Sequence, residues 1–306
     1  MALSVQSKLQ LQRTGRNVEQ LRLFSLQPKV ERAVETFKMF EETALRLHPD
    51  GYYLAFSGGK DSQAVYHLAQ MAGVRFQAHY HVTTVDPPEL VRFIKRQYPQ
   101  AVMDIPKQNM WELIIKKQFP PTRRVRYCCS ELKEYGGKGR FVVTGVRWEE
   151  SARRKTWSRA LVKAGKREQD LILLNDNNEK RRGVEHCVMK GKYILNPILD
   201  WTQEEVWAFL HQAGAGHCEL YDCGFSRIGC IGCPMASIRK REFELERYPG
   251  YKRAYLRAFE RMLAAREKER ETQWKDAGEV YGWWLYGNGK QKTQVPGQLS
   301  LFDPAS

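Results

Sequence analysis

Ser57-Gly58-Gly59-Lys60-Asp61-Ser62 follows the apolar stretch Tyr52 to Phe56 and leads into an amphipathic one. A strand, a glycine turn and a helix start form the geometry that turns backbone N–H groups toward a phosphate. The two glycines let the main chain approach an anion, and Ser57, Lys60 and Ser62 can add donors or positive charge. Asp61 or Ser62 can cap the helix. The run therefore predicts a phosphate-binding loop.

Strands and helices alternate around this loop. The pattern predicts strands over 52–56, 76–82, 101–105 and 141–146, and helices over 62–71, 88–97 and 110–117. Strands separated by helices are typical of a parallel sheet, and ligands of such sheets lie beyond the carboxyl ends of the strands. We expect an α/β fold, a parallel twisted sheet with helices on both faces, and the phosphate loop at its ligand-binding edge.

Other stretches flank this pattern. Residues 1–48 predict a helical N-terminal extension, 49–210 the nucleotide-binding α/β domain, 211–286 a cysteine-containing helical C-terminal region and 287–306 an irregular tail. Thr202-Gln203-Glu204-Glu205 is a capping box that predicts a helix start. Residues 149–191 are polar and basic, and we expect surface loops around one possible strand at 171–174.

Composition limits the class of protein. The 306 residues include 50 Lys and Arg against 35 Asp and Glu, a net charge of +15, which favours a polyanionic partner such as DNA or RNA. No stretch is long and apolar enough for a membrane helix, and the first residues lack the apolar core of a signal peptide. We expect a cytoplasmic protein without a membrane partner, in which seven cysteines indicate metal or redox chemistry rather than disulfides.

Four cysteines form two close pairs, Cys128-Cys129 and Cys230-x-x-Cys233. If the pairs meet in the fold they complete four thiolate ligands, which suit either zinc or a 4Fe-4S cluster. Free thiols are a further alternative. A rival ligand set combines Cys218 and Cys223 with the Cys230-x-x-Cys233 pair, but it leaves the vicinal pair unexplained. We expect Cys187, alone in a polar segment, to be incidental.

The S-G-G-x-D-S order resembles the PP-loop of the ATP pyrophosphatase superfamily, whose members bind an adenine nucleotide and act at its α-phosphate. Longer stretches resemble the phosphoadenylyl-sulfate (PAPS) reductase family over roughly residues 50 to 250. These are Gly145-Val146-Arg147-Trp148-Glu149-Glu150-Ser151, Asn196 to Thr202 with Glu205-Val206-Trp207, and Leu220-Tyr221-x-x-Gly224-Phe225-x-Arg227-x-Gly229-Cys230. Thr84-Val85-Asp86-Pro87-Pro88-Glu89 is a looser match that lacks a glycine of the family pattern.

The resemblance implies an adenine nucleotide α-hydrolase-like fold and roles for particular residues. It implies nucleotide binding by Ser57 to Ser62, Gly145 and Arg147, with Lys60, Asp61 and Arg147 as catalytic residues. The vicinal cysteines with the later C-x-x-C pair are similar to the cluster ligands of bacterial adenylyl-sulfate reductases. This similarity favours a 4Fe-4S cluster on Cys128, Cys129, Cys230 and Cys233, with ATP and Mg²⁺ as the other cofactors.

The family's sulfate reductases carry a C-terminal cysteine that attacks sulfur, whereas residues 234–306 contain none. Relatives without it transfer sulfur to DNA (the DndC-like phosphorothioation enzymes) or to tRNA. We therefore expect an ATP pyrophosphatase that adenylylates a substrate for sulfur transfer, with nucleic acid as the acceptor and a cysteine desulfurase as the donor. A PAPS or adenylyl-sulfate reductase that uses an external thiol, and a non-catalytic nucleotide-binding subunit, are the alternatives.

Overall fold

The computed structural model describes residues 5–150, 184–187, 192–266 and 273–287. The chain divides into two compact units. Unit 1 comprises 1–82, 86–106 and 133–229, and unit 2 comprises 83–85, 107–132 and 230–306. Unit 2 thus combines the C-terminal helices with two segments that lie inside the expected nucleotide-binding domain.

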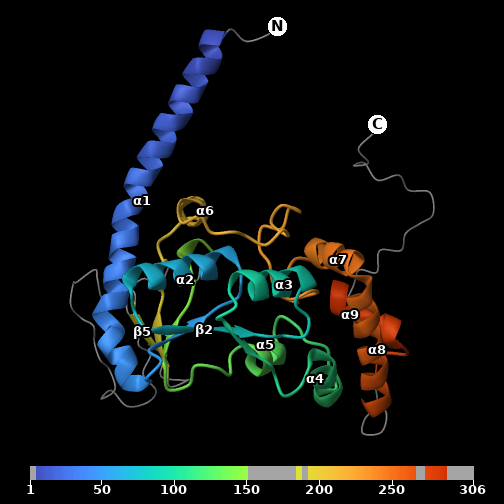
Figure 1. Ribbon diagram of the computed structural model, residues 1–306. Coiled ribbons are helices and arrows are strands. Elements are labelled where there is room, and N and C mark those ends of the chain that lie inside the picture. Colours follow the sequence, from blue (N-terminus) through green and yellow to red (C-terminus); the bar gives the residue numbers. More distant parts are fainter. Residues whose placement is uncertain (1–4, 151–183, 188–191, 267–272, 288–306) are drawn as a thin grey trace. The chain divides into compact units, whose positions relative to one another are not determined.

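Unit 1 is an α/β structure (Figure 1). Its helices are α1 (Val5–Leu47), α2 (Lys60–Ala72), α3 (Pro88–Gln97), α6 (Gln203–Gln212) and the 3-10 helix η1 (Trp148–Glu150). Its strands are β1 (Tyr52–Ala55), β2 (Phe76–His81), β3 (Val102–Asp104), β4 (Phe141–Val143), β5 (Val184–Cys187) and β6 (Lys192–Leu195).

The six strands form one sheet in the order β3-β2-β1-β4-β6-β5. The first five in this order are parallel to their neighbours, and β5 alone pairs antiparallel, with β6. The expected parallel α/β sheet is therefore confirmed. Because β1 lies between β2 and β4, the chain changes direction across the sheet beside β1. Ligands of doubly wound sheets bind at this position, beyond the carboxyl ends of the strands.

Local sequence explains the main helix boundaries. Helix α3 begins with a proline at its first position, where a missing N–H costs no helical hydrogen bond. Helix α6 begins at the capping box that the sequence predicts, with Thr202 and Glu205 each bonding the other's backbone N–H. Helix α2 ends at Gly73, which adopts the left-handed conformation that glycine accommodates without strain.

One face of the sheet packs on helices through an apolar core. Tyr52 of β1 is fully buried, contacts the Phe37 ring edge to face, and donates its hydroxyl to the Phe37 carbonyl at 2.7 Å. Phe141 of β4 and Val206 of α6 belong to the same core. Burial of these side chains fixes which face of β1 turns inward, because neighbouring strand residues point to opposite faces.

The other face of β1 and β2 is polar. The Tyr53 ring stacks on His79 at 4.0 Å, and Asp104 of β3 accepts from His79 Nδ1 at 2.9 Å. The Tyr53 hydroxyl lies 2.5 Å from His81 Nε2, and the Arg140 guanidinium lies over the Tyr53 ring. Burial lowers the pKa of His79, although Asp104 opposes the shift. The imidazole is therefore neutral near pH 7.

Unit 2 is helical in the described residues. It contains α4 (Met110–Lys117), α5 (Tyr127–Leu132), α7 (Ile238–Arg247), α8 (Pro249–Arg266) and α9 (Ala277–Tyr286). Its core includes Tyr255 and Phe259 of α8 with Trp284 of α9. Buried Arg241 closes the end of α9, because its guanidinium stacks over Trp284 and donates to the carbonyls of Trp284 and Leu285.

Several sequence predictions need correction. Neither Asp61 nor Ser62 caps α2, because the helix already begins at Lys60 with Gly59 as its N-cap. The Ser62 hydroxyl instead bonds within the loop. The segment expected to be loops contains β5, and it is followed directly by β6; neither strand was predicted, because their pairing depends on distant partners. Helix α5 was also not predicted, whereas α9 lies within the helical region expected over 211–286. The possible strand at 171–174 lies outside the described residues.

Candidate nucleotide site and cysteine cluster

The loop between β1 and α2, residues 57–62, depends on Gly58. Gly58 adopts φ +69°, and a Cβ added there would lie 2.6 Å from the Ile94 side chain and 3.0 Å from Leu90. A larger residue would be strained by its backbone conformation and would also displace α3. Gly58 therefore allows the chain to turn from β1 into α2 within a few residues.

Hydrogen bonds hold this loop in shape. Ser62 Oγ accepts from the Ser57 N–H at 3.1 Å and donates to the Gly59 carbonyl at 2.9 Å. Gln63 Nε2 donates to the Gly58 carbonyl at 3.0 Å. The first backbone bond of α2 runs from the Gln63 N–H to the Gly59 carbonyl. The loop is thus fixed before any ligand binds.

Three N–H groups of the loop make no hydrogen bond with the described part of the chain, namely those of Gly58, Asp61 and Ser62. Two of them belong to the first turn of α2, whose N–H groups have no helical partner and carry the positive end of the helix dipole. In other proteins, N–H groups at a helix N-terminus commonly bind phosphate oxygens.

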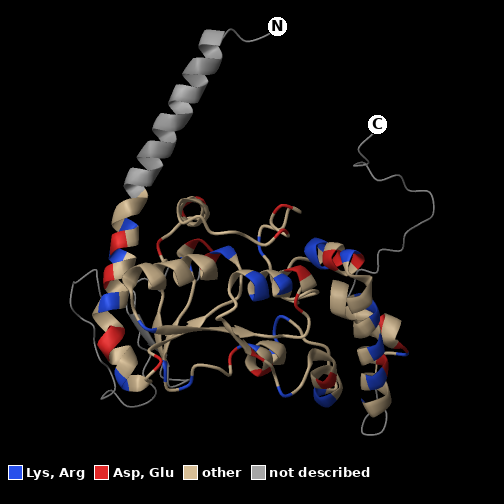
Figure 2. Ribbon diagram, viewed as in Figure 1, with Lys and Arg blue, Asp and Glu red and all other residues tan. Residues whose placement is uncertain are grey.

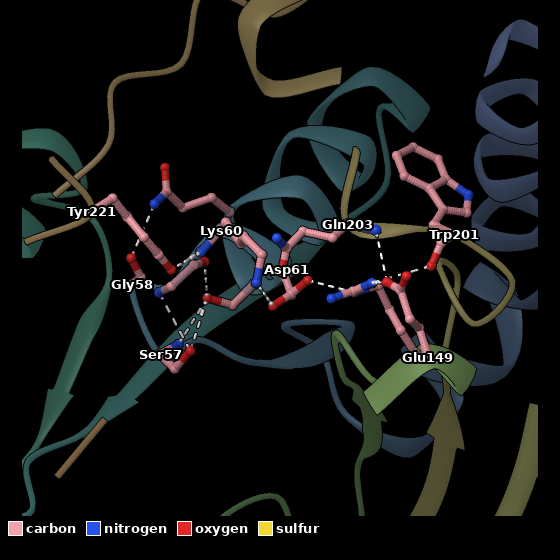
Figure 3. A network of polar contacts seen from close by, with 12 residues as sticks. Ser57, Gly58, Lys60, Asp61, Glu149, Trp201, Gln203 and Tyr221 are labelled. Atoms are coloured by element: carbon pink, nitrogen blue, oxygen red, sulfur yellow. Dashed lines mark hydrogen bonds and ion pairs between the residues drawn. The ribbon is translucent and has the colours of Figure 1, made fainter. Parts of the chain in front are cut away.

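A chain of ion pairs runs beside the loop (Figure 3). Lys60 Nζ donates to Asp61 Oδ2 at 3.0 Å, and Arg147 Nε donates to Asp61 Oδ1 at 2.7 Å. The side chains of Lys60 and Arg147 are each only 4% exposed, and that of Asp61 is 19% exposed. Asp61 neutralises two cations that have little access to water.

Arg147 continues the chain toward α6. Its Nη1 donates to Glu149 Oε2 at 2.5 Å and to the Trp201 carbonyl at 3.3 Å. Glu149 Oε2 also accepts from the Gln203 N–H in the first turn of α6. These contacts orient Arg147 toward Asp61, so in this structure Arg147 positions Asp61. Its predicted direct contact with a phosphate stays a prediction.

Gly145 brings the segment after β4 against the first turn of α2. A Cβ added at Gly145 would lie 2.9 Å from the Asp61 carbonyl carbon and 3.0 Å from its oxygen. Glycine is therefore required for the close approach of the two backbones. The predicted role of Gly145 in nucleotide binding is untested, whereas its contact with Asp61 gives it a structural role at the same site.

Sequence reasoning did not single out Tyr221 as a site residue. Its hydroxyl accepts from the Lys60 N–H at 2.9 Å, although 161 positions separate the two residues. Burial raises the pKa of Tyr221 to about 12, so the phenol is neutral. The Leu220-Tyr221-x-x-Gly224 stretch resembles the family pattern, but nothing in the neighbouring sequence indicates that Tyr221 contacts Lys60.

The four expected ligand cysteines all belong to unit 2 and lie close to one another. Cys128 is buried in α5, and Cys129 has an intermediate exposure. A hydrogen bond to Cys129, burial, and the charges of Cys129, Cys230 and Cys233 all raise the pKa of the Cys128 thiol. Four thiolates together would thus repel one another unless a metal compensated their charge.

The Cys230–Cys233 turn is anchored on both sides. The Ile231 N–H donates to the Val85 carbonyl at 2.8 Å, and the Tyr255 hydroxyl donates to the Ile231 carbonyl at 3.0 Å. Gly232 has φ +71°, and a Cβ there would lie 2.9 Å from Trp284. The Arg126 guanidinium donates to Cys129 Sγ at 3.3 Å.

The donor set fits a metal that prefers sulfur. No group of three His, Cys, Asp or Glu in the described residues has ligand geometry as it stands, so metal binding would require the thiols to converge. The rival ligands Cys218 and Cys223 belong to unit 1, and the contacts that shift the Cys218 pKa come from residues of that unit. The contacts of Cys128 therefore favour the set in unit 2.

Comparison with known proteins identifies the family. Residues 51–236 match the phosphoadenosine phosphosulfate reductase domain. The chain belongs to this family. The phosphoadenosine phosphosulfate reductase domain thus covers the loop, the segment after β4 and all four clustered cysteines.

Individual relatives are more distant. An uncharacterized protein of Methanocaldococcus jannaschii is 30% identical over 190 residues, which are 60% of this chain and 41% of that protein. An adenosine 5'-phosphosulfate reductase of Salinibacter ruber is 31% identical over 61 residues, 19% of this chain and 24% of the reductase. This chain spans less than half the length of either. The crystal structure of a phosphoadenylyl-sulfate reductase from Candida auris aligns with 65% of this chain and 87% of its own, with 16% identity and a TM-score of 0.43.

Basic residues are spread over the described surface. Figure 2 shows lysines and arginines on α3, α4, α7 and α8, mixed with acidic residues on α7. The basic stretch that the sequence singled out, Arg153-Arg154-Lys155 with Arg181 and Arg182, lies outside the described residues, as does the side chain of Cys187. Among the described helices, none has the length and apolarity needed to cross a membrane.

Proposed function

We propose that this protein is an ATP pyrophosphatase that places the nucleotide phosphates on residues 57–62. The observation that carries the proposal is the loop with three uncommitted N–H groups beside buried Lys60. The loop follows β1, beside which the strand order reverses, which is where doubly wound sheets bind nucleotides. Backbone donors fixed in place stabilise charge on transferring phosphates without reorganisation.

In the proposed reaction a substrate oxygen attacks the α-phosphorus of ATP. A phosphorus–oxygen bond forms, the α–β anhydride bond breaks, and pyrophosphate leaves with both electrons of that bond. The adenylylated oxygen is then displaced as AMP by a sulfur nucleophile. Lys60 and the N–H groups would neutralise the leaving pyrophosphate, and Asp61, held by Arg147, would fix Lys60. Mg²⁺ would arrive with the nucleotide, because protein sites commonly bind it through the phosphates and one or two carboxylates.

Nucleic acid is the proposed acceptor, and a cysteine desulfurase the proposed sulfur donor. The net charge of +15 supports a polyanionic acceptor. Cys128, Cys129, Cys230 and Cys233 would hold a 4Fe-4S cluster, which supplies a redox-active centre when bound.

The test is product analysis with each acceptor. Anaerobically purified protein is incubated with ATP and Mg²⁺, alone and with duplex DNA, with tRNA, and with a desulfurase and cysteine. We expect AMP and pyrophosphate in equal amounts, stimulated by one of the nucleic acids. ADP with orthophosphate would overturn the α-phosphate assignment. Nucleotide binding without turnover under every condition would favour the non-catalytic subunit.

A second candidate is an adenylyl-sulfate reductase that uses an external thiol. It is favoured by the family assignment and by the similarity to the Salinibacter ruber reductase. Sulfite release from adenylyl sulfate or PAPS with a thiol reductant, without pyrophosphate release from ATP, would replace the first proposal with this one.

A further inference from the structure

We infer that Tyr221 is a phosphate-binding residue of this site and that its hydroxyl donates a hydrogen bond to the bound anion. The inference rests on the part of the proposed function that places phosphates at residues 57–62. Tyr221 comes from the turn after α6 and lies against the loop (Figure 3). Its hydroxyl oxygen already accepts from the Lys60 N–H at 2.9 Å.

The hydroxyl borders the space in which a phosphate oxygen would lie. A Cβ built on Gly59 would sit 3.4 Å from the Tyr221 oxygen and 3.5 Å from Ser57 Oγ, so two hydroxyl groups border the space above Gly59. The uncommitted N–H groups of Gly58 and Asp61 come from the neighbouring positions of the same loop. An anion there would meet hydroxyl and backbone donors together.

The hydroxyl has a hydrogen left to donate. A neutral phenol has one O–H donor as well as acceptor lone pairs. The Lys60 N–H uses only an acceptor position, and the Tyr221 proton has no acceptor among the described residues. Because the pKa is raised to about 12, the proton is retained at neutral pH.

The ring is held in this position by its neighbours. Trp207 of α6 contacts it edge to face with the centroids 4.9 Å apart. The turn closes through the bonds from Tyr221 N to the Cys218 carbonyl and from Gly224 N to the Tyr221 carbonyl. The hydroxyl is therefore positioned before the ligand arrives, which limits the entropy lost on binding.

The test measures binding of inorganic pyrophosphate and of adenosine by calorimetry to the full-length wild type, Tyr221→Phe and Tyr66→Phe. Tyr66→Phe is the matched control, because it removes a hydroxyl on α2 that bonds Gln70 and Gln100 instead of the loop. Hydrogen bonds to charged groups contribute about 1.5–3 kcal/mol, so we expect Tyr221→Phe to weaken pyrophosphate binding about tenfold or more. Adenosine binding should be unchanged, and Tyr66→Phe should bind pyrophosphate like the wild type.

The outcomes separate this inference from the proposed function. Equal or tighter pyrophosphate binding by Tyr221→Phe would overturn the inference, because it would mean that the hydroxyl is idle or competes with the anion for the Lys60 N–H. Weaker binding together with no AMP formation in the product assay would keep the inference and overturn the proposed reaction. A wild type that binds no pyrophosphate would overturn both.

Discussion

Replacing Asp61 with asparagine should destabilise the nucleotide-free protein. The substitution keeps the shape of the side chain and removes the charge that Lys60 and Arg147 share. Both cations have side chains that are only 4% exposed, so their charges would be left without compensation in a site with little water.

The size of the expected stability loss follows from how deeply the ion pairs of Asp61 are buried. Removing one partner of a fully buried ion pair costs about 3–5 kcal/mol. Asp61 is 19% exposed and Arg147 keeps its ion pair with Glu149, so solvent screening and the remaining partner reduce this cost. We therefore expect Asp61→Asn to lower the free energy of unfolding by about 2–3 kcal/mol. For a domain of this size such a loss lowers the melting temperature by roughly 5 to 10 °C.

The assay is urea and thermal unfolding of the protein without nucleotide, followed by circular dichroism. Glu219→Gln is the control, because its pair with Arg92 spans 4.0 Å between side chains that are 67% and 70% exposed. That exposed pair should contribute less than about 0.5 kcal/mol to the free energy of unfolding. The double variant Lys60→Met with Asp61→Asn should be more stable than Asp61→Asn alone, since one orphaned cation is removed with its partner. An Asp61→Asn variant as stable as the control, or strict additivity in the double variant, would refute the buried ion-pair reasoning.

Three further predictions concern other parts of the protein. Anaerobically isolated protein should contain about four irons, which Cys128→Ala should remove and Cys223→Ala should leave; stoichiometric zinc without iron would contradict the cluster. Because the pKa of His79 is lowered in the folded state, the unfolded state binds the imidazole proton more readily. The stability of the protein should therefore not depend on His79 above about pH 6.5 and should fall as the pH drops below it. The variant His79→Gln should flatten that decline in acid unfolding curves, and an unchanged decline would exclude His79 as its source. Binding to DNA or RNA should weaken steeply with salt, and charge reversal at Arg153 and Arg154 should reduce the log–log slope by about 0.7–0.9 for each phosphate that the variant no longer neutralises; salt-independent binding in filter assays would contradict a phosphate-tracking surface.

Features set by a few neighbouring residues were accessible from the sequence. The helix 88–97 and the helix 110–117 have the predicted boundaries, because a proline at the first position and an amphipathic run with a capping asparagine are local signals. The start of α6 follows from its capping box in the same way. The Ser57–Ser62 loop was predicted from its two glycines and its place between a strand and a helix.

Features set by distant partners were not accessible. The contacts of Arg147 with Asp61 and of Tyr221 with the Lys60 N–H join the loop to distant parts of the chain. Strands β5 and β6 are short, and they extend the sheet only because β4 offers an edge for pairing. The need for glycine at position 145 is likewise evident only from the fold. A Cβ on residue 145 would lie 3.0 Å from the carbonyl oxygen of Asp61.

The charges at the loop bear on how it would attract the phosphate of the proposed function. Lys60, Asp61, Arg147 and Glu149 form a chain of two cations and two anions, which together carry no net charge. The attraction of the loop for an anion therefore rests on oriented donors, the N–H groups of the first turn and the nearby hydroxyls, more than on excess positive side-chain charge. The excess of fifteen positive charges lies elsewhere in the chain, so it is available to act on a partner other than the nucleotide. A site whose own ion pairs are balanced can keep Lys60 and Arg147 in place without a ligand, which is the preorganisation that the proposed attack on the α-phosphorus would need.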